Sequence, residues 1–336
     1  MRRSSSLDKR ERCVSVIIPV YKAERFLERA VRSALSQPEV AEVILIEDGS
    51  PDGSLEICRR LEAAHERVVL LRHPDGENRG AGASRNRGLE AARGEFIAFL
   101  DADDVYLPGR FEQDVDRLRA DPEALGIFHA MGACELPEER RIEGRLTTLS
   151  SVPDRDRLFE QKMGIEAVKG SFSICALTVR SRAARVVGPM NEGLRLHQDS
   201  EWISRLVLTG PLLAGQLDEP VALRGVHPGN RYLNNERRHS TNALFLQSLL
   251  SWMVDHRIPA HRQRLVADYL RVLQCHLKPS IGGRLRVVAN LFRDPRLMRN
   301  MRFCFDVLDL FLPPDGLLNR AARALGWKLY YGKYYA

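Results

Sequence analysis

The sequence lacks the marks of membrane-spanning and disulfide-stabilised proteins. No stretch approaches the roughly 20 uninterrupted apolar residues of a membrane-spanning helix. The six cysteines are scattered with no CxxC spacing, which argues against a zinc ribbon or a disulfide scaffold and favours a reducing cytosol. Residues 1–12 are basic and Ser-rich without an apolar run, so we expect a disordered leader rather than a secretory signal.

Several functional motifs are missing as well. No GxGxxG follows the first predicted strand, and there is no Walker motif, so two common kinds of nucleotide site are disfavoured. No Ser or Cys dyad suggests a covalent nucleophile, and no nucleic-acid-binding motif or internal repeat is present.

The composition fits a folded protein with a distinct C-terminal part. The chain has 336 residues, of which 44% are hydrophobic and 28% charged. From Arg231 onward, 18 Lys and Arg stand against 7 Asp and Glu, whereas the preceding part carries a formal charge of −4. We therefore predict a large domain over residues 13–230 and a basic helical region over residues 231–336.

Short apolar runs alternate with helical patterns along the first ninety residues of the large domain. This order predicts an α/β fold with a mostly parallel sheet and helices on both faces. The expected strands cover residues 13–20, 43–46, 68–71, 96–100, 126–130 and 172–179, and the expected helices cover residues 24–35, 55–64, 80–92 and 198–208. Ligands of such sheets bind beyond the carboxyl ends of the strands, where polar loops follow the first, second and fourth strands.

The loop after the fourth expected strand is the strongest candidate site. Its carboxylates, Asp101, Asp103 and Asp104, repel one another unless a cation such as Mg²⁺ or Mn²⁺ binds them. In an extended segment Asp101 and Asp103 point to one side and Asp104 to the other. The alternative is a solvated acidic turn or a helix N-cap, but the position at the ligand edge favours the metal site.

Two further segments are candidates for ligand binding. Asp48 ends the second expected strand, where it either binds a nucleobase or nucleates an Asx turn. Small residues from Gly80 begin a helix that carries Arg85, an arrangement that suits either close approach of a ligand or tight helix packing. Residues 138–170 are charged and irregular, as in a mobile loop on the acceptor side.

Two polar clusters lie later in the chain. Asp199 opens an amphipathic helix, where it acts either as a general base or as an N-cap. His227 lies in a Gly- and Pro-containing loop and is either a metal or phosphate ligand or an ordinary loop histidine.

Taken in order, these motifs resemble family 2 glycosyltransferases of the GT-A fold. The resemblance rests on VSVIIPVYKAERFLERAVRSALSQ, ILIEDGSPDGS, NRGAGASRNRGLEAARGEFIAFLDADDVYLP and HQDSEWISRL, and it covers about residues 13–230. The last motif departs from the family pattern because Gln198, rather than Glu, precedes Asp199.

The resemblance implies an inverting, metal-dependent hexosyltransferase that uses a nucleotide-sugar. The implied nucleotide-sugar-binding residues are Pro19, Val20, Tyr21, Asp48, Gly80, Arg85 and Asp101. The implied metal ligands are Asp103, Asp101 and His227, and the implied catalytic base is Asp199.

The resulting hypothesis is transfer of a sugar, from a UDP-sugar, to a glycan or lipid-linked acceptor in surface polysaccharide or glycolipid synthesis. Alternatives are a non-catalytic nucleotide-sugar-binding scaffold and a nucleotidyltransferase. We expect a cytoplasmic protein that does not bind nucleic acid. The segment over residues 281–336 mixes Arg with aromatic side chains, which suits contact with the inner face of the membrane, packing on the large domain or a homo-oligomer contact.

Overall fold

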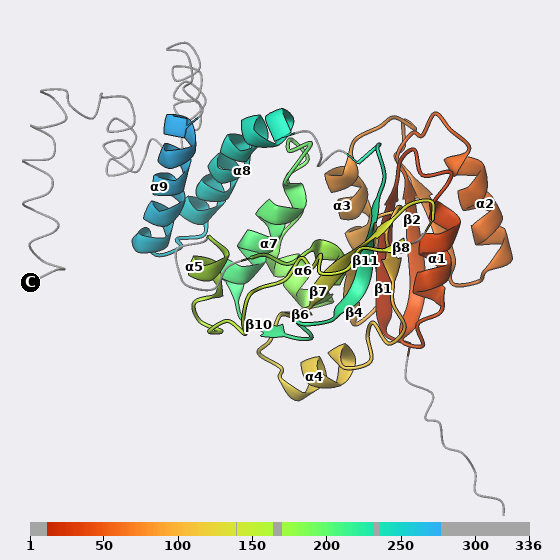
Figure 1. Cartoon of the computed structure of the whole chain (residues 1–336), viewed down its shortest axis with the longest axis horizontal. Helices are drawn as coiled ribbons and strands as arrows, with labels where there is room; N and C mark the ends of the chain where they lie inside the picture. The colour runs from red at the N-terminus through yellow and green to blue at the C-terminus, as the bar shows by residue number, and fades with distance from the viewer. Residues whose placement is uncertain (1–11, 139, 164–169, 231–234, 277–336) are drawn as a thin grey trace, which may run out of the picture. The chain divides into compact units, whose positions relative to one another are not determined.

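Figure 1 shows a computed structural model of the chain, which describes residues 12–138, 140–163, 170–230 and 235–276. The chain divides into two compact units, Met1–Phe245 and Leu246–Ala336. The predicted leader, except for its last residue, and the basic aromatic segment 281–336 lie outside the described residues.

The first unit is built on a seven-stranded sheet in the order β10-β6-β9-β4-β1-β2-β3. Its strands are β1 (Val14–Val20), β2 (Val40–Glu47), β3 (Val68–Arg72), β4 (Phe96–Phe99), β6 (Gly126–Phe128), β9 (Leu177–Arg180) and β10 (Leu212–Ala214). Neighbouring strands run parallel except at β9, which is antiparallel to β4 and β6. The predicted mostly parallel sheet is thus confirmed, and the first four strands match their apolar runs.

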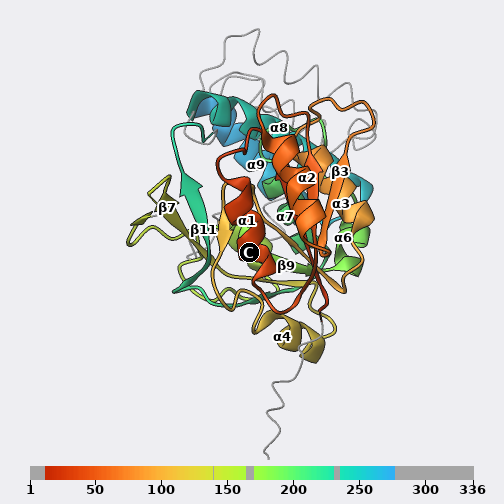
Figure 2. The ribbon, with the colours of Figure 1, turned by 90° about the vertical axis from the view of Figure 1, so that its right-hand side faces the viewer.

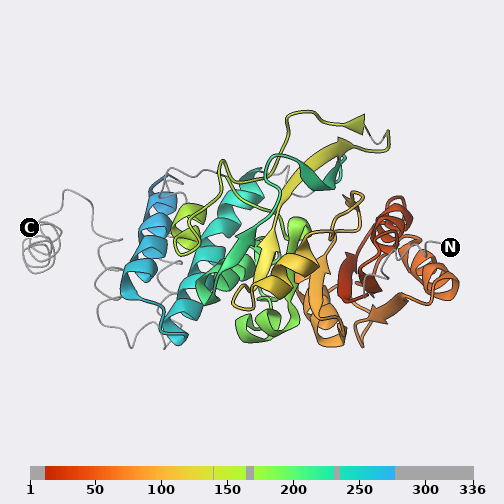
Figure 3. The same cartoon turned by 90° about the horizontal axis from the view of Figure 1, so that it is seen from below.

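Helices cover both faces of this sheet, as predicted. The helices between the first strands are α1 (Leu27–Leu35), α2 (Ser54–Ala64) and α3 (Ala81–Ala91). The helices α1 and α2 connect β1 to β2 and β2 to β3, in one direction across the sheet, whereas α3 connects β3 back to β4 in the other direction. Because such crossovers are right-handed, α3 lies on the face of the sheet opposite to α1 and α2. The red-to-orange elements of this half lie together at one side of the first unit (Figure 3).

A glycine explains how closely α3 approaches the sheet. A Cβ atom at Gly88 would lie 2.4 Å from Cγ2 of Ile17 and 3.0 Å from Cδ1 of Ile46. Real Cβ atoms do not come so close, so only glycine permits this contact. At this position the small-residue pattern of the helix serves packing.

A second, four-stranded sheet has the order β5-β11-β7-β8, and it was not predicted. Its strands are β5 (Val105–Tyr106), β7 (Ala130–Glu135), β8 (Arg140–Arg141) and β11 (Pro220–Val226). In it β7 and β11 lie side by side and run parallel (Figure 2). One consequence is that the expected strand over residues 126–130 is divided between the two sheets at His129.

The remaining elements of the first unit are mostly helical. They are α4 (Asp114–Ala120), α5 (Leu158–Lys162), the 3-10 helix η1 (Ile174–Ala176), α6 (Ser181–Val187) and α7 (Gln198–Thr209). The expected strand over residues 172–179 is therefore η1 followed by β9.

Beyond the first unit, the described chain is helical, as expected for the C-terminal region. It consists of α8 (Asn235–Asp255), which begins in the first unit, and α9 (Ala260–His276). Among the described residues, no helix combines the length and apolar character needed to cross a membrane.

Candidate active site

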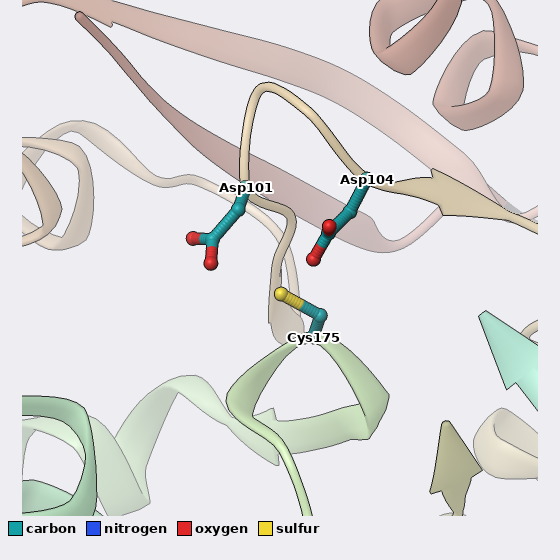
Figure 4. Close-up of side chains that lie close together, drawn as sticks. All are labelled: Asp101, Asp104 and Cys175. Atoms are coloured by element: carbon teal, nitrogen blue, oxygen red, sulfur yellow. The ribbon is translucent and has the colours of Figure 1, made fainter. Parts of the chain in front are cut away.

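The acidic segment after β4 is a tight turn. The backbone N–H of Asp104 donates a hydrogen bond to the carbonyl oxygen of Asp101 at 3.0 Å. The prediction that Asp104 points away from Asp101 is wrong, because side chains do not alternate within a turn as they do in an extended segment. Carboxylate oxygens of Asp101 and Asp104 and the sulfur of Cys175 instead lie within 4.8 Å of one another (Figure 4).

The carboxylate of Asp103 is held by the loop that follows β11. Its Oδ2 lies 3.1 Å from Nε2 of His227, and it accepts a hydrogen bond of the same length from Nδ2 of Asn230. The ring of Phe26 stacks on His227 with ring centres 4.7 Å apart. Burial and the negative charge of Asp101 raise the pKa of Asp103, although the contact with His227 opposes them. The two predicted ligands Asp103 and His227 are therefore brought together.

The turn is held between β11 and α1. The buried carboxylate of Asp104 accepts a hydrogen bond from the backbone N–H of Gly225 at 3.0 Å. A Cβ atom at Gly225 would lie only 2.2 Å from the carbonyl oxygen of Asp103, and that oxygen also accepts a hydrogen bond from Nη2 of Arg29 at 2.9 Å. Burial, with the charges of Asp103 and Asp101, raises the pKa of Asp104 well above its ordinary value. The turn thus places three acidic side chains close together, and that of Asp104 is buried.

The thiol of Cys175 closes this cluster from η1. It is buried, and burial together with the charges of Asp101 and Asp104 raises its pKa well above the ordinary value. The group is therefore a neutral thiol at neutral pH. A neutral thiol is a poor ligand for a hard cation, which prefers carboxylate oxygen.

Arg85 of α3 contacts the acidic turn from the other side. Its side chain is buried, and its Nη2 donates to Oδ1 of Asp101 at 2.6 Å. Burial lowers the pKa of Arg85, but the negative charges of Asp101 and Asp199 outweigh burial and raise this pKa above its ordinary value. Its Nε and Nη1 have no hydrogen-bond partner within the described part of the chain. The guanidinium thus joins two predicted site residues and retains free donors.

The helix α7 brings Asp199 to this site. Its N-cap, His197, has a left-handed backbone with φ of 63°, and the backbone N–H of Ser200 donates to Oδ1 of Asp199 at 2.8 Å. Gly82 of α3 permits the approach of α7, because a Cβ atom there would lie 3.3 Å from Cγ of Gln198. Among the residues with described side chains, none donates a hydrogen bond to Oδ2 of Asp199.

Asp48 lies at the carboxyl end of β2, and its buried side chain organises a neighbouring loop. The carboxylate accepts hydrogen bonds from Nδ2 of Asn78 at 2.9 Å and from the backbone N–H groups of Arg79 at 2.7 Å and Gly80 at 2.9 Å. His73 Nε2 lies 3.3 Å from the same carboxylate. Asp48 therefore holds the start of α3, including Gly80, whose φ of 92° suits glycine.

The three residues predicted from the first motif lie at the carboxyl end of β1, the strand beside β2. Pro19 and Val20 end β1, and the carbonyl oxygen of Val20 accepts a hydrogen bond from the backbone N–H of Asp48 at 2.9 Å. Tyr21 is exposed, and Nζ of Lys22 lies 5.4 Å from its ring centre. The ends of β1 and β2 therefore form one continuous edge beside the loop before α3.

Two asparagines of the site were not singled out in the sequence. Asn78 bridges Asp48 to Arg195, and Asn230 bridges Asp103 to the carbonyl oxygen of Gly225. Both lie in glycine-containing loops, where an amide both donates and accepts hydrogen bonds. This hydrogen-bonding capacity could have marked both asparagines as candidates in the sequence. Their partners could not be predicted, because those residues are distant in sequence.

The chain is similar to known glycosyltransferases. The family model "Glycosyl transferase family 2" matches residues 15–179. The chain is 29% identical over 321 residues to the uncharacterized glycosyltransferase YibD of Escherichia coli K12, with 86% of this chain and 88% of YibD covered. It is 41% identical over 100 residues to the succinoglycan biosynthesis protein ExoU of Rhizobium meliloti, which covers 30% of this chain and 29% of ExoU.

The solved structure of residues 1–349 of S. aureus TarS in complex with UDP has the same fold. Its TM-score is 0.57 at 16% sequence identity, and the match covers 96% of this chain and 93% of that chain. The predicted GT-A fold is thereby confirmed.

Proposed function

We propose that the chain is a family 2 glycosyltransferase that transfers a sugar from a UDP-sugar to an acceptor hydroxyl, with inversion at the anomeric carbon; the match to the family model over residues 15–179 and the likeness to YibD support this. The observation that carries the proposal is the convergence of three elements. Arg85 of α3 donates a hydrogen bond to Asp101 of the acidic turn, and the negative charge of Asp199, at the start of α7, helps to raise the pKa of Arg85. TarS has been crystallised with UDP and with UDP-GlcNAc, which supports a UDP-sugar as donor.

We assign the donor nucleotide to the edge formed by β1, β2 and the loop before α3. Pro19, Val20 and Tyr21 would line the nucleobase there, beside the loop that Asp48 orders. The free donors of Arg85 suit hydroxyl or phosphate oxygens of the same nucleotide-sugar. Small residues at the start of α3, Gly80 among them, permit the ligand to approach the backbone.

We assign a divalent cation, Mg²⁺ or Mn²⁺, to Asp103 with Asp101 and His227. Burial and the negative charge of Asp101 raise the pKa of Asp103, so its ionised form is unfavourable until a cation neutralises it. Asp104 serves the turn instead, because its carboxylate binds the backbone of Gly225. When bound, the cation stabilises the negative charge of the departing diphosphate.

Asp199 is the proposed general base. Its Oδ1 is held by the backbone N–H of Ser200, which orients the carboxylate and leaves Oδ2 to receive a proton. As the acceptor oxygen bonds to the anomeric carbon, the bond to the diphosphate oxygen breaks and the hydroxyl proton passes to Oδ2. Arg85 faces Asp199 and Asp101 together, so it helps to hold the donor in line with this displacement.

The experiment is an assay of purified protein with a panel of UDP-sugars and Mn²⁺ or Mg²⁺. We expect release of UDP, through transfer or slow hydrolysis, and loss of this activity with EDTA and in Asp103→Ala. Release of pyrophosphate from a nucleoside triphosphate would instead indicate a nucleotidyltransferase. Binding of UDP-sugar without turnover across a broad acceptor panel would indicate a non-catalytic scaffold.

We also propose a role in surface polysaccharide or glycolipid synthesis in the cytoplasm. The name of ExoU supports the pathway class, and the buried cysteines Cys58 and Cys175, which form no disulfide within the described part of the chain, support a reducing compartment. Contact of the basic C-terminal segment with the inner face of the membrane, or with a second copy of the chain, remains a prediction about residues outside the described part.

A further inference from the structure

The acidic turn joins two strands that belong to different sheets. It follows β4 of the seven-stranded sheet and leads into β5 of the four-stranded sheet. Before the turn, the backbone N–H of Leu100 donates a hydrogen bond to the carbonyl oxygen of Ile17 on β1 at 3.0 Å. After it, the backbone N–H of Leu107 donates to the carbonyl oxygen of Val221 on β11 at 2.9 Å. The two ends of the turn are therefore held by different sheets.

The hydroxyl group of Tyr106 connects these two ends directly. Its Oη donates a hydrogen bond to the carbonyl oxygen of Phe99 at 2.8 Å. Phe99 is the last residue of β4, and Tyr106 is the last residue of β5. The pairing of β4 with β9 ends at Ala98, so this carbonyl group lies beyond the ladder between the two strands. One side-chain hydrogen bond thus closes the chain around the acidic turn.

The side chain of Tyr106 is held firmly in place. It is buried, and the ring of Phe111 packs on it edge-on with ring centres 5.3 Å apart. The guanidinium of Arg110, which is paired with Asp114 at 2.8 Å, lies 5.4 Å from the centre of the Tyr106 ring. The backbone N–H of Tyr106 donates to Oγ of Ser33 on α1 at 3.0 Å. Burial raises the pKa of Tyr106, so its hydroxyl group keeps its proton and remains a donor.

The acceptor of this hydrogen bond also contacts the helix that carries the proposed base. The ring of Phe99 packs edge-on against Trp202 of α7, with ring centres 5.8 Å apart. Trp202 is buried, and its Nε1 donates to the carbonyl oxygen of Gly188 at 2.8 Å. It lies one helical turn after Asp199. The bond from Tyr106 therefore ties the acidic turn to a residue that packs on this helix.

We propose, on the basis of the proposed function, that Tyr106 is a positioning residue that holds the acidic turn in the shape that binds the cation. Asp101 and Asp103 both lie in the segment that its hydrogen bond closes. Removing the hydroxyl group would take a donor from the carbonyl of Phe99, a buried residue, and would free the turn to adopt other shapes. Groups that orient metal ligands contribute about 10- to 100-fold to metal affinity.

The test measures the affinity of the full-length protein for UDP by calorimetry in EDTA, Mn²⁺, Mg²⁺ and Ca²⁺. The variant Tyr106→Phe keeps the ring and removes the hydroxyl group alone. The control Ser181→Ala also removes a hydroxyl group that donates to a carbonyl oxygen, that of Glu95 at 3.1 Å, just before the other end of β4. The melting temperature of each protein without ligand reports any effect on the fold.

Tyr106→Phe should bind UDP about tenfold more weakly than the wild type in Mn²⁺, whereas the two Kd values in EDTA should agree within about twofold. The variant should also lose part of the preference of the wild type for Mg²⁺ over Ca²⁺. The reason is that Mg²⁺ requires nearly regular octahedral coordination, whereas Ca²⁺ accepts irregular coordination. Ser181→Ala should match the wild type in all four conditions.

Two results would overturn the role of Tyr106. One is a Kd for UDP in Mn²⁺ that is the same in Tyr106→Phe and the wild type. The other is an equal loss of UDP affinity in EDTA and in Mn²⁺, which would assign the hydroxyl group to the stability of the fold as a whole.

The wild type alone separates this inference from the proposed function. Wild-type protein that binds UDP equally well in EDTA and in Mn²⁺ would refute the cation assignment and, with it, the role of Tyr106. Wild-type protein that does not bind UDP would refute the proposed function itself. A wild type that requires Mn²⁺ for tight binding, with a variant that behaves identically, would refute the role of Tyr106 alone.

Discussion

Substituting Gly225 with alanine tests whether β11 positions the acidic turn. The new Cβ would lie 2.2 Å from the carbonyl oxygen of Asp103, and C···O contacts settle near 3.3–3.6 Å, so the turn must move by about 1 Å. The same movement strains the hydrogen bond from Gly225 to Asp104. Overpacking of this kind costs about 1–3 kcal/mol of stability. A misplacement of about 1 Å near reacting groups costs about 100-fold in rate.

The assay measures UDP release from the best donor together with the thermal shift that Mn²⁺ and UDP produce. We expect Gly225→Ala to remain folded, with a lower melting temperature, a turnover reduced about 100-fold and a diminished ligand-induced shift. Gly193→Ala is the matched control, because its nearest neighbour is the flexible side chain of Asn191 at 3.1 Å. Wild-type turnover and an unchanged shift in Gly225→Ala would refute the argument that β11 sets the position of Asp103.

Two other substitutions test the core and the metal ligands. Asp114 is buried and binds both Arg110 at 2.8 Å and His129 at 2.8 Å, so Asp114→Asn should lower the free energy of unfolding by about 3–5 kcal/mol in urea titrations. Burial raises the pKa of Asp114, but the contacts with Arg110 and His129 outweigh burial and lower the pKa below 3.8. The ionised carboxylate therefore stabilises the fold above pH 3.8, and this stabilisation is lost as the pH falls further. The Asp114→Asn variant should lack this pH dependence of its stability. Cys175→Ala should keep the Mn²⁺ dependence of the wild type, since a neutral thiol is no ligand, whereas loss of that dependence would show that Cys175 rather than Asp103 binds the metal.

The first half of the fold was predictable because its strands are buried on both faces. A continuous apolar run that is bounded by turn residues, such as that of β1, predicts a buried strand. The second sheet was missed because β5 and β8 have two residues each, too few to show any periodicity. The longer strand β11 contains Arg224 and Gly225, which are typical of a loop in the sequence. It nevertheless forms a strand, because it pairs with β5 and β7.

The candidate site was predictable in its residue types but not in its contacts. The approach of His227 to Asp103 joins segments 124 positions apart, and no local pattern encodes such a pair. The turn at Asp101 depends on a backbone hydrogen bond that alternation rules ignore.

The rate of sugar transfer by Asp199→Asn tests the central claim most directly. The amide keeps the shape of the side chain and accepts the hydrogen bond from Ser200, but it is not a base at neutral pH. With the best donor and acceptor, kcat should fall by about 100-fold or more, while the Kd for UDP with Mn²⁺ stays within about twofold of the wild type. A kcat within about threefold of the wild type would contradict the assignment of Asp199 as the general base.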